Sequence, residues 1–155
     1  MNLRESLGEK LSARLNETLD NAFFSENRDE LMDSCRKASV SLLDQEGYFT
    51  PVMVFVEMGV LSKRMLRLWH TGHLPAIRPM IRLSDSMIDR CIGVMKDVAD
   101  QHSLAVRYMP FYDPRVPAEA EQRPILPFTL SHDQAMERSL SLSVSRPVMR
   151  KRKNR

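Results

Sequence analysis

Three segments of this chain repeat apolar residues at the spacing of an α-helix, and this pattern predicts a mainly helical fold. Leucines stand at every fourth position from Leu3 to Leu19, and further apolar sets run from Leu31 to Leu42 and from Met87 to Val98. With only 5 glycines but 11 methionines in 155 residues, composition also favours helices over a turn-rich sandwich or barrel.

Capping and breaking residues divide the chain into further helices. We expect a second helix to start near Ser25 and to stop at Gly47. Thr50 followed by Pro51 predicts a third helix, which runs to about Met58. Two more helices are predicted by a serine cap at their start, over residues 62–70 and 84–101.

A smaller β element is expected near the C-terminus. The segments 104–109 and 125–130 are predicted to pair as a hairpin, with a proline-rich mobile loop between them. A short helix should follow from Asp133 to about Leu142. The predicted fold is thus mainly α with a small β element (α+β), as one domain over residues 1–145 followed by a disordered basic tail, 146–155.

The formal net charge of +3 conceals an uneven distribution of charge. Residues 1–50 carry a net charge of −4 and residues 85–145 carry −3. Residues 51–84 carry +4, and the last ten residues add six positive charges. A local basic region within an acidic body indicates a site for a polyanion rather than a general affinity for one.

The central basic region coincides with a predicted helix-turn-helix over residues 51–75. Gly59 permits the left-handed backbone that a tight turn between two helices requires, and Ser62 caps the second helix. Trp69 is expected to pack that helix onto the core, together with Leu66. The basic residues of the second helix then lie largely on its outer side, as docking into a DNA major groove requires.

The same stretch resembles the helix-turn-helix of excisionases and of mercury-resistance-type regulators over about a sixth of the chain. The matching positions are Phe55, Gly59, Val60, Ser62, Lys63, Arg64, Arg67, Trp69, Gly72, Leu74, Pro75 and Ala76. The resemblance implies that residues 62–67 meet bases and phosphates and that residues 72–78 form a wing-like turn near the DNA backbone. A fainter similarity, through Thr50-Pro51, Trp69 to Pro75 and Phe128 to Ser131, is to a bacterial family with no assigned function.

Two departures from the family pattern affect these expectations. Leu61 is an extra residue between the turn and the capping serine, and Pro79 follows where a β wing usually begins. The predicted DNA-binding residues are Ser62, Lys63, Arg64, Arg67, His70, His73, Arg78 and Arg82. The alternative for this segment is that it only packs helices together and that its cations form an ordinary solvated surface.

Residue patterns that carry catalysis or bind metals are weak in this sequence. His70 and His73 have no cysteine or carboxylate cluster beside them, and Cys35 and Cys91 fall on apolar helix faces. Ser131, His132 and Asp133 are consecutive, and a catalytic triad needs side chains from separate elements. We therefore expect no catalytic residue, metal or cofactor; a hydrolase that uses the histidines is the remotest alternative.

The expected function is a bacterial DNA-binding protein, a transcriptional regulator or a mobile-element accessory factor, with double-stranded DNA as its partner. The alternative is a non-catalytic scaffold subunit that pairs with a protein partner, or with its own copy, through the Leu3–Leu19 helix. No signal peptide and no membrane span are expected, and the two cysteines suit a reducing cytoplasm.

Overall fold

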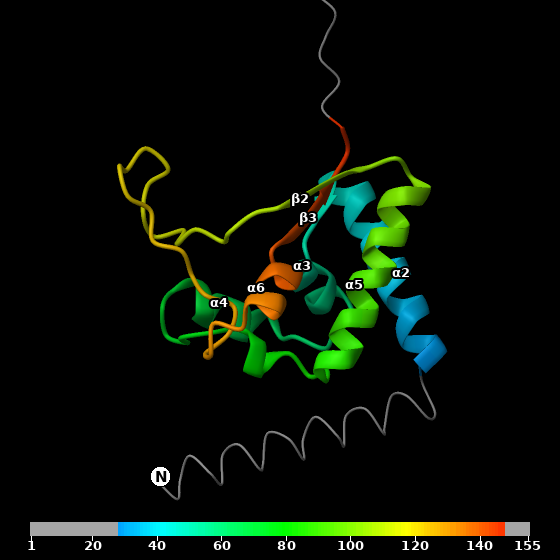
Figure 1. Cartoon of the computed structure of the whole chain (residues 1–155), viewed down its shortest axis with the longest axis horizontal. Helices are drawn as coiled ribbons and strands as arrows, with labels where there is room; N and C mark the ends of the chain where they lie inside the picture. The colour runs from blue at the N-terminus through cyan, green and yellow to red at the C-terminus, as the bar shows by residue number, and fades with distance from the viewer. Residues whose placement is uncertain (1–27, 148–155) are drawn as a thin grey trace, which may run out of the picture.

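The computed structural model describes residues 28–147, and these form five α-helices, one 3-10 helix and three short strands (Figure 1). The predicted Leu3–Leu19 helix and nearly all of the basic tail lie outside the described residues. The α-helices are α2 (Arg28–Glu46), α3 (Pro51–Glu57), α4 (Lys63–His70), α5 (Asp85–Gln101) and α6 (Gln134–Leu140). The 3-10 helix is η1 (Arg78–Met80), and the strands are β1 (Tyr48–Phe49), β2 (Ala105–Tyr108) and β3 (Leu142–Ser145).

Helices α2 and α5 lie side by side along one flank of the molecule (Figure 1). Their facing sides carry the apolar residues that the sequence placed on helix faces, and Cys35 and Cys91 have no exposed surface. Gly47, at φ +80°, ends α2 where the sequence predicted it. Ser84 caps α5 by accepting a hydrogen bond from the Met87 N–H at 3.3 Å. Both predicted helices are confirmed over the described residues.

The predicted succession of helix, turn and helix over residues 51–75 is also present. Thr50 occupies the N-cap position of α3, and Gly59 has the left-handed φ of +81° that the turn requires. Ser62 caps α4 through a 3.1 Å hydrogen bond from the Met65 N–H to its hydroxyl. Gly72, at φ +79°, follows the end of α4.

The β element differs from the predicted hairpin. Strand β2 is confirmed, but its partner is β3, and the three antiparallel strands lie in the order β1-β3-β2. The predicted partner, residues 125–130, contributes only an isolated bridge from Ile125 to Tyr112. Pro127 lies in its middle and has no N–H to donate to a ladder. The C-terminal β-hairpin was therefore wrong, while the mainly α fold with a small β element is confirmed.

The rest of the C-terminal region packs onto this framework. Helix α6 is capped by Asp133, whose carboxylate accepts a 3.1 Å hydrogen bond from the Met136 N–H. The Glu137 carboxylate accepts hydrogen bonds from the backbone N–H groups of Phe128 and Thr129. One hydrophobic core includes residues of the five α-helices and of strands β1 and β3. Among the described helices, none is long and apolar enough to cross a membrane.

Candidate nucleic-acid interface

The three cations of α4 lie on one exposed side of that helix. Lys63, Arg64 and Arg67 are all exposed. At about 100° per residue, positions 63, 64 and 67 fall within an arc of about 100°. Within residues 28–147, no carboxylate forms an ion pair with any of them. Their charge is therefore available to an external anion.

Trp69 fixes the opposite side of α4 to the core. It has no exposed surface, and its indole N–H donates a 3.1 Å hydrogen bond to the Pro127 carbonyl. Its ring centroid lies 4.8 Å from that of Phe111 and 5.3 Å from that of Phe128. The sequence prediction for Trp69 is correct, whereas Leu66 is only half-buried. Trp69, with the partly buried Met65 and Leu66, therefore anchors α4 by the side opposite its exposed cations.

The C-terminal end of α4 is held by a pair of residues that the sequence analysis did not single out. Arg115 donates from Nη1 to the Thr71 carbonyl at 3.0 Å and from Nε to the Asp113 carboxylate at 2.9 Å. Hydrogen bonds from the Arg115 side chain, and then from its backbone N–H, lower the pKa of Asp113 to about 2. The sequence did carry a turn signal here, because Asp113 precedes Pro114.

Arg82 lies at the other end of the candidate interface. Its guanidinium donates to the Gly59 carbonyl, and its backbone N–H donates to the Val60 carbonyl at 2.9 Å. The residue remains exposed. The fold therefore places a fourth cation at the turn before α4, although Arg82 is fifteen positions beyond Arg67 in sequence.

Arg78, in contrast, is directed into the molecule. Its side chain is only 15% exposed and forms an ion pair with Asp85, with Nε 3.0 Å from Oδ1. It also donates to the Leu83 carbonyl at 3.0 Å. These contacts hold the start of α5 against η1 and leave little of the guanidinium for phosphate. We therefore do not include Arg78 in the interface.

The two histidines at the end of α4 differ in environment. His70 is half-buried, and its ring stacks on Phe111 with centroids 4.8 Å apart and an interplanar angle of 8°. Burial lowers the pKa of His70, which favours the neutral ring. His73 is exposed, with Nδ1 2.8 Å from the Thr71 hydroxyl. Of the two, only His73 is placed to meet a ligand at the surface.

Both departures from the family pattern are visible in the structure. Leu61 is 1% exposed, and its N–H donates to the Phe55 carbonyl at 3.2 Å, so the extra residue becomes part of the core. Residues 71–77 form turns without a strand and lead into η1. This segment therefore has a 3-10 helix at the position where those families usually begin a β wing.

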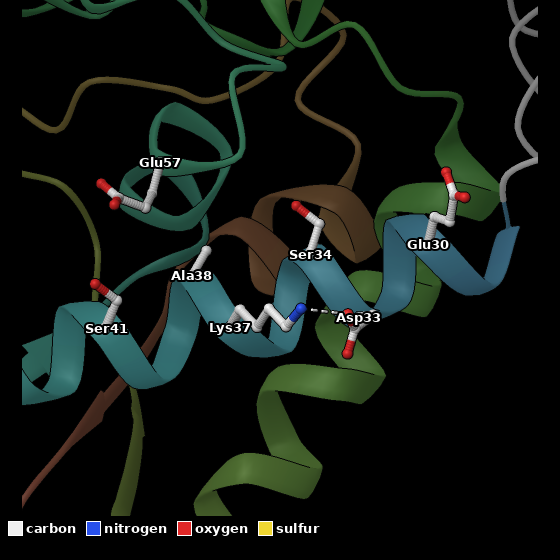
Figure 2. Close-up of a pocket in the computed structure, with 7 residues that line it drawn as sticks. All are labelled: Glu30, Asp33, Ser34, Lys37, Ala38, Ser41 and Glu57. Atoms are coloured by element: carbon white, nitrogen blue, oxygen red, sulfur yellow. Dashed lines mark ion pairs between the residues drawn. The ribbon is translucent and has the colours of Figure 1, made fainter.

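A different part of the surface has the opposite charge. An open hollow of about 490 Å³ lies between α2 and the end of α3, and Figure 2 shows the side chains that line it. Three of these are acidic, Glu30, Asp33 and Glu57, and the single cation, Lys37, pairs with Asp33 at 2.9 Å. Because this hollow would repel phosphate, it does not extend the candidate interface.

No described group of three or more His, Cys, Asp or Glu side chains could hold a metal ion. Asp133 serves as the cap of α6, in keeping with the structural role that its sequence position suggested.

Comparisons with family models, curated proteins and solved structures find no match to this chain.

Proposed function

We propose that this protein binds double-stranded DNA, with α4 as the helix that enters the major groove. One observation carries the proposal: Lys63, Arg64 and Arg67 share an exposed side of a helix and have no described carboxylate partner. A helix held by its opposite side can present such cations to phosphates and base edges. With the resemblance to excisionases and mercury-resistance-type regulators, this favours a bacterial transcriptional regulator or mobile-element accessory factor.

The residues of the interface have different proposed tasks. Arg64 and Arg67 would reach base edges or phosphates in the groove, because a guanidinium can donate two parallel hydrogen bonds to guanine or phosphate. Lys63 and Ser62 lie at the N-terminus of α4, where the helix dipole favours a phosphate. Arg82 and His73 would contact the DNA backbone on either side of the helix. His70 and Arg78 act within the protein instead.

The test is binding of the full chain to a random-sequence duplex pool, measured by fluorescence anisotropy between about 50 and 200 mM salt. Removing two phosphate contacts should reduce the slope of log affinity against log salt by about 2. We therefore expect R64A/R67A to bind at least about tenfold more weakly at low salt and to show the smaller slope.

The charge-matched control is K96A/R107A, which removes two exposed cations from α5 and β2. The control should bind like the wild-type protein. If the wild-type chain binds no duplex at about 50 mM salt, the proposal is wrong. An equal loss in both double variants would instead show attraction by net charge alone and would remove α4 from the interface.

A further inference from the structure

Among the described strands, β2 lies at an edge of the sheet, and none of them pairs with the side of its backbone that faces away from β3. The Met109 N–H donates to the Ser141 carbonyl at 2.8 Å, so that pair is a hydrogen-bonded one. Hydrogen-bonded pairs alternate along an antiparallel ladder, which gives the next ones at Arg107 and Ala105. The backbone N–H and C=O groups of Val106 and Tyr108 therefore point toward the open edge.

Exposed apolar side chains lie along this edge. Val106 is 42% exposed, Met109 49% and Ile125 56%. Beside the end of β2 lies a hollow of about 300 Å³, lined mainly by apolar side chains and by one arginine. Its lining includes Tyr108, Pro110, Ile125, Leu126, Phe128 and Arg138. An open strand edge next to an apolar hollow is the arrangement by which a domain binds an extended peptide.

The charge at this edge selects the kind of peptide. The Arg138 guanidinium lies 3.9 Å from the centroid of the Tyr108 ring, and no described carboxylate pairs with it. Glu137, which also lines the hollow, is occupied by the N–H groups of Phe128 and Thr129. Arg107 on β2 is exposed as well. Two cations thus flank the strand edge and complement a negatively charged occupant.

We propose that β2 binds an extended segment of a partner protein by strand addition, and that this segment carries an apolar and an acidic side chain two positions apart, on the face that it shares with Tyr108. Its backbone pairs with Val106 and Tyr108, an apolar side chain fills the hollow, and a carboxylate meets Arg138. A second copy of this chain fits less well, because β2 pairing symmetrically with its own copy through Val106 and Tyr108 would place the Arg107 side chains of the two molecules directly opposite each other.

The test is selection of random peptides displayed on phage by the full-length protein, followed by affinity measurements on the enriched peptides. We expect enriched peptides to carry an apolar and an acidic residue two positions apart. V106P should weaken their binding at least about tenfold, because proline removes the outward N–H without removing a β2–β3 hydrogen bond. V106A loses nearly all of the same side chain but keeps this N–H, so it should retain most of the affinity.

Charge reversal gives an independent readout on a variant that leaves the strand unchanged. Selection on R138E should enrich basic residues in place of acidic ones at one position. Failure to enrich any peptide, or equal binding to V106P and V106A, would overturn the proposal. Concentration-dependent dimerisation that V106P abolishes would also overturn it, since the occupant would then be a second copy.

Discussion

At the scale of single residues, two N-cap positions of the helix-turn-helix can be compared directly. Ser62 accepts a hydrogen bond from the Met65 N–H, whereas Thr50 makes no such side-chain bond. S62A should therefore lower the free energy of unfolding by about 1 kcal/mol. T50A, the matched control, should have a smaller effect. Urea denaturation of both variants measures the difference, and equal losses would contradict the role of the Ser62 hydroxyl.

A second residue-scale prediction concerns the response of stability to acid. Burial lowers the pKa of His70 in the folded chain, so folding favours the neutral ring. The contribution of the neutral His70 ring to the free energy of unfolding is fully present above the unfolded pKa of about 6.5. It decreases as the pH falls below that value. H70F retains an aromatic ring against Phe111 but cannot titrate.

Thermal unfolding at pH 7.5 and 5.5 provides the measurement. Acidification should destabilise the wild-type protein more than H70F, because the exposed His73, His102 and His132 are common to both. If the two proteins lost stability in parallel over this range, protonation of His70 would not be the cause.

At the scale of elements, the end of α4 and the segment after β2 depend on each other through Gly72 and Arg115. Gly59 and Gly72 both have left-handed backbones, so alanine at either should cost roughly 1 to 2 kcal/mol. A Cβ at Gly72 would also overlap the Arg115 guanidinium, whereas one at Gly59 would meet nothing. G72A should therefore destabilise the protein more than G59A.

A double-mutant cycle separates these two contributions. In an R115A background, where the guanidinium is absent, the cost of G72A should fall to about that of G59A. Urea denaturation of the four proteins in the cycle provides the comparison. If the cost of G72A were unchanged by R115A, the contact would not couple the two segments.

The helices could be predicted from sequence because each carries its own local signals. The boundaries of α3, α4 and α5 follow from a cap, a proline or a glycine that acts within one turn of the chain. The sheet depends on partners far apart in sequence, and β1 has only two residues, too few for an alternating pattern. Strand β3 did carry that signal, since Leu142 and Val144 alternate with serines, but the expected helix included Leu142 and left only three residues before the expected tail.

At the scale of the whole molecule, the positions of some cations near the candidate interface could not be predicted from the sequence. The exposed cations of α4 could be predicted because they share one helix. Arg82 and Arg78 have the same charge and lie four positions apart, yet one meets the turn at Gly59 and the other pairs with Asp85. The path of the chain between α4 and α5 determines which of these two arginines meets the turn and which pairs with Asp85. The Asp113–Arg115 pair likewise acquires its role from the distant end of α4.

The two cysteines can report global unfolding of the protein. Cys35 and Cys91 are the only cysteines in the chain and have no exposed surface, and the Cys35 thiol donates to the Cys91 carbonyl. A hydrogen bond with the Cys35 side chain, together with burial, raises the pKa of Cys91. Since neither thiol has exposed surface, a thiol reagent should label neither residue until α2 and α5 separate.

The labelling rate should then follow the stability of the whole fold. L43A truncates a core residue of α2 that is 3% exposed and should cost about 2 to 5 kcal/mol. A loss of 2 kcal/mol should raise the labelling rate about thirtyfold, since each 1.4 kcal/mol is a factor of 10. If L43A lowered the urea midpoint without accelerating labelling, the cysteines would become accessible through local opening, and α2 and α5 would not unfold as one unit with the rest of the core.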